Sequence, residues 1–178
     1  MTTPAPHPPS APGPRLFLAL WPPAEVAARL QEQADRWIWS AGARRTRPER
    51  LHITLHFIGT VADATVPALR QALDVQWTGC ELLLDRAEVW PGGIAVLEAS
   101  QLPPALQAFH DALGERVRGC SLAIESRRYR PHVTYARKAQ GSLAPADGLP
   151  LRWAAGPAYL LVQSVPGGGG YVPLQRFG

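Results

Sequence analysis

The chain has 178 residues, of which 46% are hydrophobic, and it carries a formal net charge of +4 at pH 7. This length suits one domain with a substantial buried core, while 19 prolines and 16 glycines argue against long uninterrupted helices. Cys80 and Cys120 give neither a disulfide framework nor a metal-binding spacing, and the apolar run LFLALW is too short to span a bilayer. We therefore expect a cytoplasmic protein with reduced thiols.

The first third of the chain predicts a tail, two strands and a helix. Residues 1–14 are rich in proline and lack core-forming side chains, so they predict a disordered tail before a single domain over 15–178. Residues 15–22 predict a buried strand, and residues 23–38 predict a helix that opens on proline. An arginine-rich loop then leads into a predicted strand over 51–59.

The remaining segments alternate in the same way. Residues 63–75 predict a helix that starts close to Pro67, because proline is tolerated only in the first turn. The segments after it predict, in chain order, a strand pair over 80–91 and 93–100, a helix over 102–117, a strand over 130–137, a strand with an opening bend over 152–164, and a turn with a last strand over 167–177.

The order of these elements occurs twice. Strand, helix, arginine-rich segment and a strand with a His-x-Thr tripeptide follow one another in each half of the chain. Strands interleaved with packed helices indicate an α+β protein of two similar lobes. Two equivalent strands that face each other across the join would line a cleft.

The repeated tripeptides are HIT at 52–54 and HVT at 132–134. Because residues i and i+2 of a strand share a face, each lobe presents an imidazole together with a hydroxyl. A neutral imidazole accepts a proton from water and a protonated one gives a proton to a leaving oxygen, while the hydroxyls of Thr54 and Thr134 donate to phosphate oxygens. The pattern predicts acid–base catalysis that requires no metal.

Arginine accounts for nearly all of the basic residues. The overall abundance of arginine fits the codon usage of a GC-rich genome, but its position does not follow from codon usage. Eight of the arginines lie within eight residues of the two histidines: Arg44, Arg45, Arg47, Arg50, Arg127, Arg128, Arg130 and Arg137. This clustering predicts a site that attracts phosphodiesters and RNA.

Four segments resemble the 2H phosphoesterases, in particular the bacterial and archaeal RNA 2',3'-cyclic phosphodiesterase branch, also called 2'-5' RNA ligase-like. They are RLFLALWPP, RPERLHITLHFIGTV, YRPHVTYAR and LLVQSVPGGGGYVPLQRF, and they follow the family order from residue 15 to the end. The resemblance implies a bilobal, pseudo-symmetric α+β fold, with two antiparallel-type β-sheets flanked by helices around a central cleft. It also implies metal-independent and cofactor-independent hydrolysis of a 2',3'-cyclic phosphate to a 2'-phosphomonoester.

The same resemblance implies the roles of the motif residues. His52 corresponds to the proton donor and His132 to the proton acceptor, although the near-symmetry of the motifs permits the reverse. Thr54 and Thr134 correspond to the phosphate-binding partners. The substrate would be RNA with a 2',3'-cyclic phosphate terminus or a 2',3'-cyclic nucleotide, acted on by a monomer, with 2'-5' ligation as a minor reverse activity.

Three further residues correspond to substrate-binding positions of the family. Arg137 lies five residues after His132 and matches a phosphate or substrate arginine, and Phe57 lies at the equivalent place after His52. Simple alternation points both away from the cleft, so a bend must turn them inward. For Phe57 a core position is an equally good interpretation. Tyr129 stands where the family often has phenylalanine and is expected to line the cleft.

Other interpretations stay open at this point. The chain is alternatively an RNA- or nucleotide-binding module without turnover, or His52, His56 and His132 form a zinc site. His56 itself is expected to be a solvated strand residue, and His110 a solvated helix residue. The four glycines at 167–170 predict a hairpin turn or a mobile loop over the cleft.

Overall fold

The computed structural model describes residues 13–146 and 150–178, so the predicted disordered tail lies almost entirely outside the described residues. All strand pairings are antiparallel and form two sheets, as the sequence predicts. The larger sheet has eight strands in the order β10-β9-β1-β3-β7-β6-β5, with β2 paired to β7. Its strands are β1 (Arg15–Leu20), β2 (Arg44–Arg45), β3 (Ile53–Thr60), β5 (Arg86–Trp90), β6 (Ile94–Glu98), β7 (His132–Arg137), β9 (Tyr159–Val165) and β10 (Gly170–Phe177).

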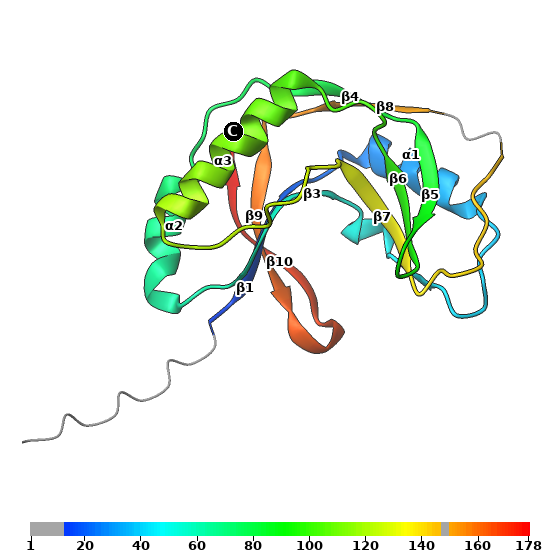
Figure 1. Ribbon diagram of the computed structural model, residues 1–178, viewed down its shortest axis with the longest axis horizontal. Coiled ribbons are helices and arrows are strands. Elements are labelled where there is room, and N and C mark those ends of the chain that lie inside the picture. Colours follow the sequence, from blue (N-terminus) through cyan, green and yellow to red (C-terminus); the bar gives the residue numbers. More distant parts are fainter. Residues whose placement is uncertain (1–12, 147–149) are drawn as a thin grey trace, which may run out of the picture.

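The large sheet consists of two four-stranded halves that meet between β3 and β7. Their pairing consists of one residue pair, Ile53 with Val133. The halves diverge from this point and form the two lobes visible in Figure 1, with β1, β3, β9 and β10 on one side and β5, β6 and β7 on the other. The two-lobed α+β architecture is confirmed, and the two predicted motif strands are the ones that meet.

The second sheet links the lobes. It pairs β4 (Cys80–Leu84) with β8 (Leu151–Ala155), and in Figure 1 it runs across the top of the molecule between them. The sequence pattern was wrong here, because 80–91 and 152–164 are each divided into two strands. The backbone N–H of Asp85 donates to the carbonyl of Glu98, and its carboxylate accepts from Ser100, which turns the chain from β4 into β5.

A glycine divides the second of these segments. Gly156 follows the last residue of β8 and has a φ of 109°, a backbone conformation that residues with a side chain rarely adopt. A Cβ at this position would lie 2.5 Å from the Cα of Gly79 and 2.7 Å from the ring of Trp77. Pro157 follows and donates no backbone hydrogen bond to a strand ladder, so β9 begins only at Tyr159.

The helices occupy the predicted segments with shifted ends. They are α1 (Ala24–Asp35), α2 (Val66–Ala72) and α3 (Pro104–Gly119), with short 3-10 turns η1 (Pro48–Arg50), η2 (Asp63–Thr65) and η3 (Pro166–Gly168). Proline lies in the first turn of α2 and α3, where its missing N–H costs nothing. No helix in the described part of the chain is long and apolar enough to cross a membrane.

Apolar side chains from both lobes form the main core, and Phe17, Ala19 and Val162 form a second, smaller cluster. On α3 the main core takes Leu106, Phe109, Leu113 and Val117, a spacing of three and four residues that places them on one face. Ile53 and Val133 at the join are both fully buried in it. The core therefore fixes the point where β3 and β7 meet, and with it the side chains on the other face of these strands.

Candidate active site

The two motif histidines are held in the same way. The Nδ1 of His52 lies 2.7 Å from the carbonyl oxygen of Arg50, and the Nδ1 of His132 lies 2.6 Å from that of Arg130. Because a carbonyl oxygen only accepts, each Nδ1 carries the hydrogen and each neutral ring keeps a lone pair on Nε2. Both Nε2 atoms are therefore available as proton acceptors.

The strand register brings the two motifs together. Ile53 and Val133 point into the core, so the residues on either side of each point to the opposite, half-buried face. These are His52, Thr54, His132 and Thr134. On this face the Nε2 of His52 lies 3.2 Å from the hydroxyl of Thr54. The predicted imidazoles and hydroxyls thus share one face at the join of the lobes.

A β-bulge after each motif changes the direction of the following side chains. In β3 the pairing with β1 skips Leu55, and in β7 the pairing with β6 skips Tyr135. Each bulge reverses the alternation once. Consequently Phe57 and Arg137, which simple alternation would bury, are exposed. The bend that the sequence analysis required for these two residues is present in both strands.

Phe57 does not belong to the core. Its side chain is 41% exposed, and its cross-strand partner is Phe17, whose ring centroid lies 5.1 Å from that of His52. Directly opposite residues share a face of a sheet, so Phe57 lies on the face that carries His52. The guanidinium of Arg15 lies 5.4 Å from the Phe57 ring centroid. This position fits contact with a ligand, not packing of the interior.

Burial and positive neighbours dominate the electrostatics of His52. Burial, as the largest cause, lowers the pKa of His52 to about 4 together with repulsion from His132 and Arg137, against the hydrogen bond to the carbonyl of Arg50. Three aromatic rings surround its imidazole at centroid distances of 5.0 to 5.3 Å: Trp21, Phe17 and Tyr171. Sequence reasoning missed these rings, because no motif in the sequence links Phe17, Trp21 and Tyr171 to His52.

Comparisons with known proteins agree with this arrangement. A family model described as LigT like Phosphoesterase matches residues 20–94. A crystal structure described as a phosphoesterase is 25% identical with a TM-score of 0.80, and covers 93% of this chain and 97% of its own. The structure of E. coli LigT in apo form is 25% identical with a TM-score of 0.77, covering 94% and 98%. Comparison with curated protein sequences gives no match.

The chain is similar to the LigT-like phosphoesterases, the 2'-5' RNA ligase-like members of the 2H phosphoesterase superfamily, in the sequence of residues 20–94 and in fold over nearly its whole length. This likeness supports phosphodiesterase chemistry as the general class of activity. The resemblance stated from the sequence is confirmed. It rests on the fold over nearly the whole chain, together with a family model that spans the first of the two motifs.

Two histidines of the chain lie where the sequence did not place them. His56 follows the bulge in β3 and is only 5% exposed, on the face opposite His52. Its ring stacks on His110 of α3 at 3.9 Å, and its Nε2 lies 2.7 Å from the His110 carbonyl oxygen. Both predictions of solvated residues were wrong, because the bulge turns His56 inward and α3 covers it. His52, His56 and His132 therefore do not converge on a zinc ion.

Tyr129 joins this stack and not the motif face. Its ring lies 4.0 Å from that of His110, nearly parallel to it, and its hydroxyl is buried without a hydrogen-bond partner in the described structure. A hollow of about 290 Å³ lies beside the stack, between α3 and residues 124–129. The expectation that Tyr129 lines the cleft between the histidines is not met by this placement.

The clustered arginines divide into two groups. Three are paired with carboxylates: Arg45 with Asp35, Arg127 with Glu125, and Arg130 with Glu88 and Glu98. Five have no carboxylate partner within residues 13–146 and 150–178: Arg44, Arg47, Arg50, Arg128 and Arg137. Only the second group offers unpaired positive charge to a phosphate, so the sequence count overstates the charge available.

The Gly-rich segment forms a turn beside His52. Residues 166–168 form η3, which leads into β10, and Tyr171 on β10 lies edge-on to the imidazole of His52 at 5.3 Å. The side chain of Arg50 reaches toward this turn, with its Nη2 3.5 Å from the carbonyl oxygen of Gly168. The hairpin turn of the sequence analysis is present. The central cleft stays a prediction.

Proposed function

We propose that this LigT-like phosphoesterase hydrolyses the 2',3'-cyclic phosphate of RNA termini or nucleotides to a 2'-phosphomonoester. The observation that carries the proposal is the pair of His-x-Thr motifs on one face, with both imidazoles fixed through Nδ1 and with the lone pair of each neutral ring on Nε2. The reaction needs one proton acceptor and one proton donor on opposite sides of phosphorus. Two equivalent imidazoles on strands that meet at the join suit this requirement.

In the proposed reaction His132 accepts a proton from water, and the resulting hydroxide attacks phosphorus. The bond between phosphorus and the 3' oxygen breaks, and His52 gives its proton to that oxygen, which leaves the phosphate on the 2' position. Thr54, Thr134 and Arg137 donate hydrogen bonds to the phosphate oxygens, where negative charge develops. Exchange of protons with solvent restores both histidines.

The low pKa of His52 is compatible with the donor role once substrate is bound. In the free protein the ring is neutral at pH 7, because burial, His132 and Arg137 all disfavour its charged form. A phosphate anion between the two imidazoles opposes that repulsion and raises the pKa of His52. An imidazolium in this desolvated site then loses its proton to the leaving oxygen readily. The same groups allow a minor 2'-5' ligation by reversal.

The likeness to E. coli LigT supports a nucleotide ligand. That protein has been crystallised with 3'-AMP and with ATP, and these structures are 26% identical to this chain. On this basis RNA with a cyclic phosphate end, or a cyclic nucleotide, is the proposed substrate. We further propose that the enzyme acts as a single-domain monomer in the cytoplasm, without a metal or cofactor.

The test is incubation with 2',3'-cyclic AMP in excess EDTA, with product analysis by phosphorus NMR. The expected product is 2'-AMP. His52→Ala and His132→Ala are each expected to lower kcat by about 10²–10⁴. Wild-type turnover by both variants, or activity that EDTA abolishes and Zn²⁺ restores, would contradict the mechanism. Salt-dependent nucleotide binding without any product would favour the binding-module alternative.

A further inference from the structure

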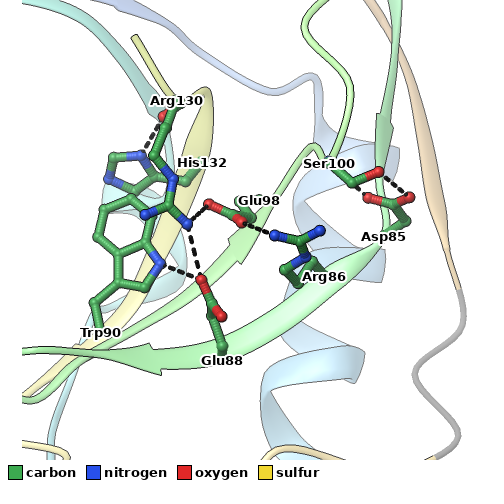
Figure 2. A network of polar contacts seen from close by, with 8 residues as sticks. All are labelled: Asp85, Arg86, Glu88, Trp90, Glu98, Ser100, Arg130 and His132. Atoms are coloured by element: carbon green, nitrogen blue, oxygen red, sulfur yellow. Dashed lines mark hydrogen bonds and ion pairs between the residues drawn. The ribbon is translucent and has the colours of Figure 1, made fainter. Parts of the chain in front are cut away.

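A buried carboxylate lies beside His132 and has no role in the reaction described so far. Glu98 is 2% exposed and is the direct cross-strand partner of His132 in the β6–β7 pairing. Its carboxylate accepts a hydrogen bond from Arg130 at 2.5 Å and one from Arg86 at 3.3 Å. Figure 2 shows Glu98 between these two arginines. A charge this deeply buried requires such partners.

Arg130 connects Glu98 to the imidazole of His132. Its backbone carbonyl accepts from the Nδ1 of His132, and its guanidinium also donates to Glu88 at 2.9 Å. The guanidinium lies 4.2 Å from the ring centroid of Trp90, which in turn lies 4.4 Å from that of His132. The indole N–H of Trp90 donates to Glu88 at 2.6 Å. Figure 2 shows the indole next to both the guanidinium and the imidazole, so His132 is held through its Nδ1 and by contact with Trp90.

The other lobe holds His52 differently. Arg50 stands in the position equivalent to Arg130, but its guanidinium lies 5.9 Å from the Tyr171 ring centroid and reaches a backbone carbonyl. The imidazole of His52 is surrounded by the rings of Phe17, Trp21 and Tyr171. The carboxylate network is thus specific to the His132 side, although the two motifs are otherwise alike.

Several charged groups act on His132. Burial is the largest cause that lowers the pKa of His132, and the positive charges of Arg127 and Arg130 lower it as well. Glu98 raises it, together with the hydrogen bond to the carbonyl of Arg130. Across the join, the positive charge of a protonated His132 lowers the pKa of His52. Glu98 is therefore the negative group that opposes two arginines and burial at this imidazole.

We propose that Glu98 is the positioning residue of His132: it fixes Arg130 and supplies the negative charge that stabilises the imidazolium formed when His132 accepts a proton. The part of this inference that concerns catalysis rests on the proposed function. The part that concerns the proton affinity of His132 does not. A purely structural role for Glu98 would leave that affinity unchanged in a folded variant, which separates the two explanations.

The first experiment follows the His132 imidazole resonances by NMR as a function of pH, with the assignment made from the spectrum of His132→Asn. Glu98→Gln removes the negative charge and is expected to lower the pKa of His132 by about one unit, roughly a tenfold loss of proton affinity. Arg130→Gln removes a positive charge but keeps the backbone carbonyl that accepts from His132. This variant is expected to raise the pKa of His132. The double variant should return close to the wild-type value.

The second experiment measures kcat/KM against pH with 2',3'-cyclic AMP. In Glu98→Gln the acidic limb of the kcat/KM profile, which reports the proton acceptor His132, should move to lower pH. The value of kcat should fall, and KM should change less. Glu98→Asp keeps the negative charge and should restore part of the pH profile and part of kcat. Asp85→Asn is the matched control, because Asp85 is a carboxylate of the same lobe that bonds Ser100 and not Arg130.

Shifts of the same direction in Glu98→Gln and Arg130→Gln, or no shift in either, would overturn the proposal. If Glu98→Gln does not fold, a fall or no change in the pKa of His132 in Arg130→Gln overturns it as well. If the wild type does not hydrolyse the cyclic nucleotide, the proposed function fails, and the NMR titration still decides whether Glu98 controls the proton affinity of His132.

Discussion

At the scale of single residues, Arg137 is the cation best placed to act on a phosphate at the motif face. The bulge in β7 exposes it on this face, its charge lowers the pKa of His52, and it has no carboxylate partner in residues 13–146 and 150–178. A guanidinium without a carboxylate partner offers its full set of donors to an anion. Its function is therefore expected to be substrate binding and not stabilisation of the fold.

Arg137→Gln is expected to raise KM for 2',3'-cyclic AMP by roughly 10-fold to 100-fold, the range for loss of a hydrogen bond to a charged group. It should also raise the pKa of His52, because one source of repulsion is removed. Steady-state kinetics and NMR titration measure both effects. Arg152→Gln is the control, since Arg152 pairs with the exposed Glu81 on the β4–β8 sheet. An unchanged KM in Arg137→Gln would remove this residue from the site.

The motif residues were predictable from the sequence because they obey the simplest rule of a strand. His52, Thr54, His132 and Thr134 precede the bulges, so alternation places them correctly. His56 follows a bulge, and alternation therefore assigns it to the wrong face. A β-bulge is defined by the pairing between two strands, and the sequence of one strand alone does not show this pairing.

At the scale of elements, the contact between α3 and β3 contains an unusual polar pair. His56 and His110 stack at 3.9 Å, and Tyr129 covers the other side of His110. Burial lowers the pKa of His110 to about 4, with a further contribution from His56 and against Asp111 and a backbone hydrogen bond to Leu55. The same cause lowers the pKa of His56. The contact therefore requires both rings to be neutral.

This pair makes the stability of the fold depend on pH. In the unfolded chain a histidine titrates near pH 6.5, so as the pH falls the unfolded state binds the proton first. The stabilisation is complete above about pH 6.5 and is lost as the pH falls toward 4. For His110, whose side chain is 14% exposed, the loss amounts to at most about 3 kcal/mol over this range.

Urea unfolding of the wild type and of His110→Phe between pH 7.5 and 4.5 tests this. Phenylalanine keeps a ring in the stack, removes the buried Nδ1, which lies 3.5 Å from the Asp111 carboxylate, and does not titrate. The variant is expected to lose less stability on acidification than the wild type does. His52 and His132 titrate in both proteins, so the difference isolates His110. Equal losses in the two proteins would contradict the assignment.

The elements themselves were predicted unequally. The helices start where proline permits a first turn, and this signal is local, so α2 and α3 begin close to their predicted positions. The division of 80–91 and of 152–164 depends on contacts with distant segments, namely Asp85 with Ser100 and Gly156 with Trp77. Apolar runs that continue through such points look like single strands.

At the scale of the whole molecule, the two lobes meet through one residue pair between β3 and β7 and are tied by β4 and β8. The repeated order of elements predicts the two lobes, because each repeat has its own strands and helix. It does not predict that strands from opposite halves of the sequence form the linking sheet.

The unpaired arginines extend the positive charge beyond the motif face and place two like charges side by side. Arg44 of β2 is the cross-strand partner of Arg137 of β7, and both are exposed. Like charges directly opposite each other destabilise a sheet. An anion bound between the two side chains would relieve this repulsion. We therefore expect Arg44 to contact a phosphate of the RNA strand next to the cyclic end.

Arg44→Gln should leave turnover of 2',3'-cyclic AMP nearly unchanged, because this nucleotide has no neighbouring phosphate. For an oligoribonucleotide with a cyclic phosphate end, KM should rise, and the slope of log KM against log salt concentration should fall by about 0.7, the value for one phosphate contact on a single strand. The variant should unfold at a slightly higher urea concentration. Arg127→Gln is the control, since Arg127 is paired with Glu125 and should leave the slope unchanged. An equal slope for the wild type and Arg44→Gln would show that Arg44 does not contact RNA. RNA binding would then not explain why Arg44 and Arg137 lie opposite each other.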